Sequence, residues 1–264
     1  MKKIEKILVK YAIQAGQCAK GMQRRGLKRT DKGGGDFATA ADLKSEQIIL
    51  RGLRKELPQI PVISEEQKLP TVVPPECIVC DPVDGTIIYA HGCNDWGVSV
   101  CYICDGQPMV GVMVAPSLDR IVVARQGAGC TVNGKRVRLK SPKPGERYLA
   151  AFDICHATDT RYIDRVIKPL MQKTMIIRSL GTAVGSTLEL LEGKVSAYIA
   201  PKGGKVWDFA AAALAVEESG GAVFAPDGSK VRWNSIPIGV VLAADKKLCR
   251  DLVALTKKSG VKVG

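Results

Sequence analysis

Residues 81–86 read Asp-Pro-Val-Asp-Gly-Thr and directly follow the short apolar run 77–80. The proline turn allows the carboxylates of Asp81 and Asp84 to aim at one point, while Gly85 admits a phosphate close to the backbone. Hard carboxylate oxygens favour Mg²⁺ as the bound ion. Because Asp-Pro-x-Asp-Gly is also a common turn sequence, this stretch alone leaves a purely structural role open.

Two more carboxylates, Glu65 and Asp208, lie at the ends of predicted elements, where catalytic or metal-binding side chains are expected. Glu65 follows the apolar run 61–64, just as Asp81 follows its own run. A third carboxylate close to the aspartates would allow two Mg²⁺ ions to be bridged at about 3.5–4 Å. Asp208 opens an alanine-rich segment, so it could be the N-cap of a helix, a metal ligand, or both.

Hydrophobic periodicity predicts a mixture of helices and strands. Apolar residues at helical spacing predict an opening helix that fades near the glycine run 33–35, which is expected to be a loop. We further expect a helix capped by Thr39, strands at 61–64, 77–80, 97–103, 109–115 and 120–124, and helices at 159–172, 182–192 and 208–219. Turn residues between the strands of 97–124 indicate an antiparallel meander.

A Pro- and Gly-containing break at 141–145 predicts two closely packed halves. Residues 1–140 would form a metal-binding half and residues 145–264 a substrate-binding half. The opening residues form an amphipathic pattern interrupted by charges, and no stretch approaches the roughly 20 apolar residues that a spanning helix needs. We therefore expect a cytoplasmic protein with no membrane partner.

Cysteines and histidines carry no chemistry in this interpretation. Nine cysteines suit a reducing compartment. The CxxC pairs at 77–80 and 101–104 suggest a zinc site, but both lie in strand-like runs, where side chains three positions apart point to opposite faces. Core cysteines are therefore expected. The only two histidines, His91 and His156, lack the spacing of a metal or nucleophile site.

The net charge of +13 favours an anionic partner. A phosphorylated metabolite, RNA and an acidic membrane surface would all qualify, and charge alone does not choose among them. Much of the excess lies between residues 20 and 32, where a solvated basic face explains it as well as a nucleic-acid site does. Nucleic acid is thus a possible partner that this charge does not favour over the others.

In combination, these motifs resemble the inositol monophosphatase family. The resemblance is carried by Gly-Asp-Phe-Ala-Thr-Ala-Ala-Asp at 35–42, Ser-Glu-Glu at 64–66, the stretch 81–86 and Trp-Asp at 207–208, in matching order and spacing. Further similarity at 127–134 and 178–183 extends it over nearly the whole chain. It implies a layered α-β-α-β-α fold, lithium sensitivity and a homodimer.

The resemblance also implies a site and a mechanism. Mg²⁺ would be held by Glu65, Asp81, Asp84, Asp208 and the backbone carbonyl of Val83. A metal-activated water would attack phosphorus, positioned by Glu65 and Thr86, with Asp42 accepting a hydrogen bond from Thr86. The phosphate and substrate would be cradled by Gly85, Thr86, Gly181, Thr182 and Ala183.

Departures from the family pattern bear on the substrate. Residues 84–89 read Asp-Gly-Thr-Ile-Ile-Tyr where inositol-phosphate relatives usually carry Asp-Gly-Thr-Thr-Asn-Phe, and Ala200 stands about where a glutamate usually binds ring hydroxyls. Lys202 and Lys205 could instead meet a second phosphate, although a solvated lysine loop explains them equally.

The predicted function is a Mg²⁺-dependent phosphomonoesterase for a small phosphorylated polyol or sugar of the inositol-1-phosphate type. The alternatives are a 3′(2′),5′-bisphosphate nucleotidase acting on adenosine 3′,5′-bisphosphate and a fructose-1,6-bisphosphatase. A non-enzymatic alternative is a basic protein that binds RNA or a transcription complex on the same fold.

Overall fold

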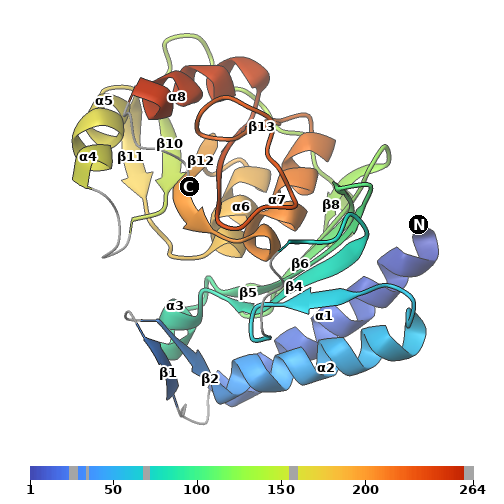
Figure 1. Ribbon diagram of the computed structural model, residues 1–264. Helices are drawn as coiled ribbons and strands as arrows, with labels where there is room; N and C mark the ends of the chain where they lie inside the picture. Colours follow the sequence, from blue (N-terminus) through green and yellow to red (C-terminus); the bar gives the residue numbers. More distant parts are fainter. Residues whose placement is uncertain (24–28, 34–35, 68–71, 155–159, 259–264) are drawn as a thin grey trace.

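Helices and sheets alternate in five layers in the computed structural model, which describes residues 1–23, 29–33, 36–67, 72–154 and 160–258 (Figure 1). A helix pair covers one face of a seven-stranded sheet, a second pair lies between this sheet and a five-stranded sheet, and the last helices cover the outer face. This confirms the α-β-α-β-α expectation. The layers contain α1 (Lys2–Gln23) and α2 (Ala40–Glu56), then α6 (Ala183–Leu191) and α7 (Val206–Glu218), then α8 (Lys246–Lys258).

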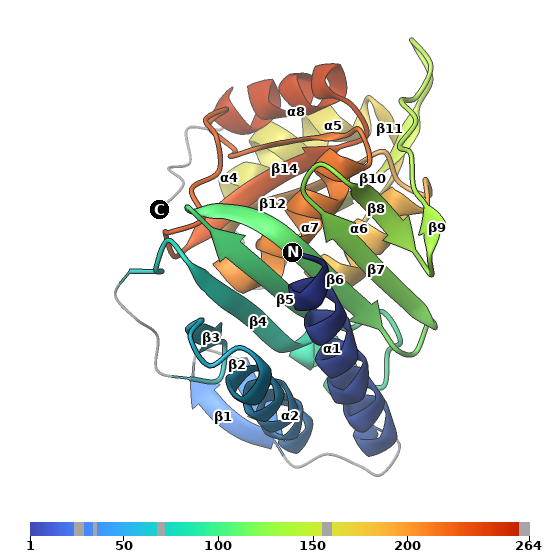
Figure 2. The same cartoon turned by 90° about the vertical axis from the view of Figure 1, so that its right-hand side faces the viewer.

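The larger sheet is mostly an antiparallel meander, as its turn residues predict. Its strand order is β3-β4-β5-β6-β7-β8-β9, and only β3 and β4 are parallel. The strands are β3 (Val62–Ser64), β4 (Cys77–Asp84), β5 (Gly97–Cys104), β6 (Gln107–Ala115), β7 (Arg120–Arg125), β8 (Gly129–Val132) and β9 (Lys135–Arg136). Helices α1 and α2 pack on one face of this sheet (Figure 2).

The smaller sheet has the order β11-β10-β12-β14-β13. The central strand β12 pairs parallel with β10 and antiparallel with β14. The strands are β10 (Tyr148–Phe152), β11 (Thr174–Arg178), β12 (Ala197–Gly204), β13 (Ala222–Phe224) and β14 (Ile238–Ala243). The predicted break at 141–145 lies between the strands of the two sheets, and the division into two halves stays a prediction.

Small residues bring the middle helices close to the larger sheet. A Cβ atom added at Gly111 on β6 would lie 2.9 Å from the Cα of Ala211 on α7. One added at Gly97 on β5 would lie 2.4 Å from a methyl group of Val184 on α6. Because neither distance leaves room for a side chain, glycine at these strand positions fixes how deeply α6 and α7 sit.

Two predicted elements differ from the structure. The first helix ends at Gln23 instead of continuing toward the glycines, and the segments on either side of the expected loop form two antiparallel strands, β1 (Arg29–Gly33) and β2 (Asp36–Thr39). The pairing of these strands satisfies backbone groups that a loop would leave to water. Gly34 and Gly35 lie outside the described residues.

The predicted helix 159–172 is broken into three parts. A short α4 (Thr160–Tyr162) leads into a π-helical turn at Ile163–Ile167 and then α5 (Lys168–Met171). Pro169 has no N–H to donate back to the preceding turn, so the α-helical ladder is interrupted at this point. Residue 159 is not among the described residues. In the described part of the chain, no helix is both long and apolar enough to span a bilayer.

Candidate metal centre and active site

Asp81 and Asp84 lie where β4 departs from regular pairing with β5. The register is regular up to Asp81, which pairs with Ser99, and shifts before Asp84, which pairs with Gly97. The Oδ1 atom of Asp81 accepts a hydrogen bond of 2.9 Å from the amide of Val83. Both aspartates are buried, with 3% and 5% of their surface exposed. The bulge therefore holds two carboxylates inside the molecule at a sheet end.

Asp84 joins the end of β4 to the start of α6 by hydrogen bonds. Its carboxylate accepts hydrogen bonds from the Thr182 hydroxyl and from the amides of Ala183 and Val184, at 3.0 and 2.7 Å for the amides. These donors form the first turn of α6, whose free N–H groups and dipole favour a negative charge. Sequence reasoning placed Thr182 and Ala183 against the substrate, whereas the structure shows them holding Asp84.

Asp208 is not the N-cap of its helix, contrary to one of the interpretations above. Helix α7 begins at Val206, Lys205 is its N-cap, and Asp208 is the third residue. The Oδ2 atom of Asp208 accepts a hydrogen bond of 2.8 Å from the Lys205 amide. This carboxylate therefore satisfies an amide that the helix itself leaves unpaired, and it is oriented by that bond.

Asp42 is the third residue of α2 and forms the other half of a capping box with Thr39. Its Oδ2 accepts from the Thr39 amide at 2.8 Å and from the Thr39 hydroxyl at 2.5 Å. Its Oδ1 accepts from the Thr86 hydroxyl at 2.9 Å, and the same hydroxyl lies 3.1 Å from the carbonyl oxygen of Val83. Asp42 thus fixes Thr86, the first residue of the short helix α3 (Thr86–Ala90).

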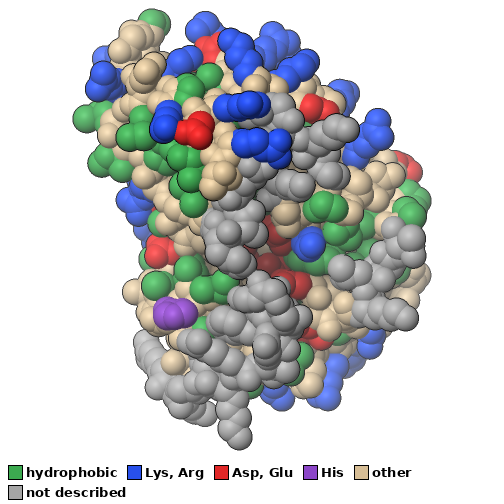
Figure 3. All heavy atoms as spheres, turned by 60° about the vertical axis from the view of Figure 1, so that its left-hand side comes forward, with side chains coloured by type: hydrophobic (Ala, Val, Ile, Leu, Met, Phe, Trp, Pro, Cys, Tyr) green, Lys and Arg blue, Asp and Glu red, His purple; other side chains and the backbone are tan. Residues whose placement is uncertain are grey.

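Burial and neighbouring acidic side chains raise the pKa values of Asp81 and Asp208. Burial raises the pKa of Asp81 well above its usual value, and the charges of Glu65, Asp84 and Asp208 raise it further. Burial, Glu65 and Asp84 do the same to the pKa of Asp208, and Lys205 only partly opposes them. Figure 3 shows acidic side chains gathered near the middle of one face. Four carboxylates are therefore close enough to repel one another.

The donor chemistry of this cluster fits a hard divalent cation, because carboxylate oxygens are the ligands that Mg²⁺ prefers. As the side chains stand, no group of three or more His, Cys, Asp and Glu residues within the described ranges is arranged to hold a metal. Asp84 accounts for part of this, since both of its oxygens accept hydrogen bonds from α6. A cation would have to draw Asp84 partly away from those donors.

The two glycines predicted to contact the phosphate both have a left-handed backbone conformation. Gly85 has a φ of +84°, and a Cβ there would lie 3.0 Å from the Cβ of Thr182, so only glycine fits between β4 and α6. Gly181 also has a positive φ, of +69°. The side chain of Lys202 and the whole of His156 are outside the described part of the chain.

The cysteine interpretation is confirmed by the packing of the strands. Cys77 and Cys101 lie in the core between the sheets, whereas Cys80 lies in the core under α1 and α2. The two ends of the first CxxC pair therefore face opposite sides of the sheet. His91 is exposed at the end of α3.

One acidic residue near the site was missed by sequence reasoning. Asp153 directly follows β10, and burial raises its pKa to about 7, with a further contribution from the charge of Asp84. The hydroxyl of Tyr198 donates to its Oδ2 at 2.5 Å. The signal that would have found it is the one used for Asp81: a carboxylate that directly follows an apolar strand.

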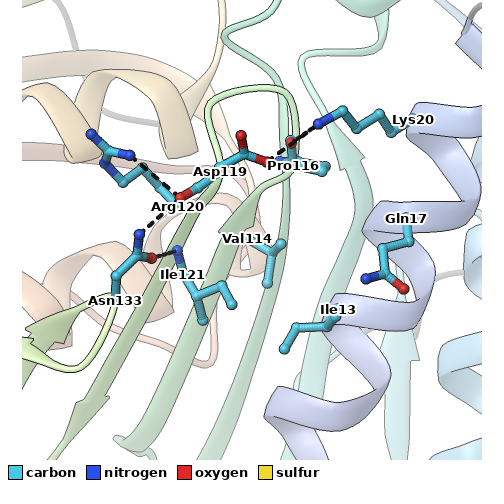
Figure 4. A pocket seen from close by; sticks show the side chains of 9 residues that line it. All are labelled: Ile13, Gln17, Lys20, Val114, Pro116, Asp119, Arg120, Ile121 and Asn133. Atoms are coloured by element: carbon cyan, nitrogen blue, oxygen red, sulfur yellow. Dashed lines mark hydrogen bonds and ion pairs between the residues drawn. The ribbon is translucent and has the colours of Figure 1, made fainter.

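A cavity of about 400 Å³ lies elsewhere, between α1 and the β6–β7 part of the larger sheet (Figure 4). None of the predicted site residues lines it. Lys20 donates to the Pro116 carbonyl at 2.6 Å, and the Asn133 side chain bonds the Ile121 amide and the Asp119 carbonyl, each at 2.8 Å. These polar groups partner one another, so the cavity offers few of them to a ligand.

Comparison with known proteins assigns the family. The family model described as the inositol monophosphatase family matches residues 1–259. The chain belongs to the inositol monophosphatase family. Inositol monophosphatase 2 of Solanum lycopersicum is 30% identical over 235 residues, covering 84% of this chain and 88% of the relative.

Relatives named SuhB are nearly as similar in sequence to this chain as the relative named inositol monophosphatase. The Nus factor SuhB of Pasteurella multocida is 28% identical over 252 residues, covering 94% of this chain and 93% of the relative. The crystal structure of the extragenic suppressor protein suhB from Bartonella henselae has a TM-score of 0.87 at 24% identity and covers 98% of this chain and 99% of that one. This likeness shows the fold. Family membership therefore does not by itself choose a substrate.

Proposed function

We propose that this chain is a Mg²⁺-dependent phosphomonoesterase for a small phosphorylated polyol or sugar. One observation carries the proposal: Asp81 and Asp208 are buried with Glu65 and Asp84 near enough for their charges to raise the pKa of both, an arrangement that a divalent cation would stabilise. The carbonyl oxygen of Val83 would complete the ligand set. Mg²⁺ would supply a nucleophile at neutral pH and offset the charge of a phosphate dianion.

The residues of the chain would each contribute a separate part of the reaction. Glu65 and Thr86 would hold the attacking water in line with phosphorus. The bond from Thr86 to Asp42 fixes the hydroxyl that does so. Amide groups beside Gly85 and at the start of α6 would bind the phosphate oxygens, once Asp84 turns toward the cation.

The proposal is tested by phosphate release from inositol 1-phosphate, fructose 1,6-bisphosphate and adenosine 3′,5′-bisphosphate, with Mg²⁺ and with EDTA. We expect turnover of at least one substrate that EDTA and Asp84→Asn both abolish. Asp164→Asn is a matched control, because Asp164 is an exposed aspartate paired with Lys168 on the outer helices. Turnover that survives EDTA, or no turnover of any of the three with Mg²⁺, would contradict the proposal.

A second candidate function has support from the charge and from one relative. The chain carries a net charge of +13 and is 28% identical to a protein named as a Nus factor. A role on RNA or in a transcription complex would use this basic surface. Binding to RNA should weaken steeply between 50 and 200 mM salt, by roughly tenfold or more if several phosphates are contacted, whereas turnover should follow Mg²⁺.

A further inference from the structure

Asp153 is a buried carboxylate that the proposed mechanism does not use. The parallel register of β10 and β12 pairs Phe152 with Ile199, and the amide of Asp153 donates to the Ile199 carbonyl at 3.0 Å. The register thus brings Asp153 level with Ala200 on the neighbouring strand. Its side chain lies on the same face as Tyr198, whose hydroxyl donates to it at 2.5 Å.

The face of the smaller sheet that carries Asp153 and Tyr198 lies next to the cluster formed by Glu65, Asp81, Asp84 and Asp208. The charge of Asp84 raises the pKa of Asp153, and the charges of Asp153, Asp84 and Asp208 all raise the pKa of Tyr198. The Tyr198 ring is 6.3 Å, centroid to centroid, from the ring of Phe209, the residue after Asp208. Asp153 and Tyr198 therefore stand next to the place where phosphate chemistry is proposed.

The two oxygens of Asp153 differ in what they contact. Oδ2 is held by Tyr198, whereas Oδ1 is buried and has no hydrogen-bond partner among the described residues. A buried acceptor without a donor is unfavourable, so a donor from outside the chain would stabilise it. A hydroxyl group is such a donor. A second phosphate is not, because it would meet the negative charges of Asp153, Asp84 and Asp208.

We propose that Asp153, held in place by Tyr198, accepts a hydrogen bond from a hydroxyl group on the uncharged polyol or sugar part of the substrate. Ala200, on the neighbouring strand, stands where relatives that act on inositol phosphates usually carry a glutamate. Asp153 would supply a carboxylate in place of that glutamate. The inference rests on the phosphomonoesterase function proposed above. It narrows the substrate to a monophosphate with free hydroxyl groups and disfavours a bisphosphate.

The test compares two substrates on the same preparation of Asp153→Asn. Inositol 1-phosphate offers hydroxyl groups, whereas p-nitrophenyl phosphate offers none and reports on the phosphate chemistry alone. We expect kcat/KM for inositol 1-phosphate to fall roughly 10- to 100-fold further than kcat/KM for p-nitrophenyl phosphate. Adenosine 3′,5′-bisphosphate should lose less than inositol 1-phosphate does, because the substitution removes a negative charge.

Tyr198→Phe tests the positioning role of the tyrosine. It should shift the same substrate ratio in the same direction but by less, while the Mg²⁺ dependence of p-nitrophenyl phosphate turnover keeps its midpoint. Asp164→Asn should leave the ratio unchanged. Because the ratio is measured within each preparation, a loss of folded protein alters both rates equally and does not mimic the effect.

Three results would overturn the inference. Equal losses on both substrates would show that Asp153 supports the fold or the cation instead of the hydroxyl. No loss on either substrate would show that no substrate group meets Oδ1. A wild-type protein that hydrolyses p-nitrophenyl phosphate but prefers no phosphorylated polyol or hexose would have no hydroxyl recognition. Failure of the proposed function is distinct, since the wild-type protein would then hydrolyse neither compound.

Discussion

Asp42 and Asp208 occupy equivalent places in two helices, and they differ in how many of their oxygens are used. Each is the third helical residue and accepts a 2.8 Å hydrogen bond from the amide of the N-cap residue, Thr39 or Lys205. Asp42 accepts two more bonds, from the hydroxyls of Thr39 and Thr86. Asp208 has no further donor in the described part of the chain, and its other oxygen stays available.

The charges around the two carboxylates differ in the same way. Burial raises the pKa of Asp42, and the hydrogen-bond donors that surround it partly oppose this. Carboxylates surround Asp208, and the charges of Glu65 and Asp84 raise its pKa further. One capping geometry therefore occurs in two different electrostatic environments. A carboxylate saturated with donors orients another side chain, and a carboxylate with a spare oxygen among like charges is suited to bind a cation.

The largest difference should follow from Asp208→Asn. Asparagine keeps an acceptor for the Lys205 amide but removes the charge, so phosphatase activity should fall at least about 100-fold. Without Mg²⁺ the variant should unfold at the same temperature as the wild type or about 2–4 °C higher, because a repelling charge is gone. Mg²⁺ should raise the unfolding temperature of the wild type and much less that of the variant.

Thermal unfolding with and without Mg²⁺ separates this effect from a loss of structure. An inactive Asp208→Asn protein that keeps the full Mg²⁺-induced shift would show that Asp208 is not a ligand. Asp208 would then only accept the hydrogen bond from the amide of its N-cap residue, and it would not differ from Asp42 by binding a cation.

Asp42→Asn should act mainly on stability. The amide N–H₂ group would face donors from Thr39 or Thr86, leaving one of them without an acceptor, and the free energy of unfolding should fall by about 1–3 kcal/mol. Activity should fall about tenfold through the loosened Thr86, while the Mg²⁺-induced shift in unfolding temperature is retained. Urea unfolding in EDTA measures the first effect. Loss of the Mg²⁺ shift would place Asp42 in the same class as Asp208.

Local patterns in the sequence predicted much of this fold. The cap at Thr39, the meander of β5 to β7 and the opposite faces of Cys77 and Cys80 follow from periodicity and turn residues within a few positions. The broken outer helix was missed because periodicity continues through Pro169 while the amide that the ladder needs is absent. The pairing of β1 with β2 was missed because short strands carry little periodicity.

The spacing of residues in the sequence does not predict contacts between distant segments of the chain. Asp84 and the amide of Val184 are 100 positions apart, and nothing in either segment specifies that the start of α6 meets the end of β4. The register of β10 against β12, which brings Asp153 level with Ala200, is likewise a property of the assembled sheet. The motif order predicts which carboxylates belong to the site, and the fold determines which of their oxygens already accept hydrogen bonds.

The last comparison tests whether Asp153 belongs with Asp208 as a carboxylate with a spare oxygen. Its pKa is raised to about 7 in the fold, from an ordinary value of 3.8. Between these values the folded protein binds more protons at this residue than the unfolded chain does. The free energy of unfolding should therefore fall as pH rises from about 4 to about 7, by up to about 1.4 kcal/mol per pH unit, and this contribution should be constant above that range.

Urea unfolding in EDTA at several pH values, for the wild type and for Asp153→Asn, isolates this contribution. Asp81 and Asp208 also have raised pKa values and give a slope of the same sign, but they do so in both proteins. The difference between the two curves therefore belongs to Asp153, and it should grow toward pH 7 in favour of the variant. Parallel curves would mean that Oδ1 of Asp153 is solvated or bonded in solution, and Asp153 would then join Asp42 as a satisfied carboxylate.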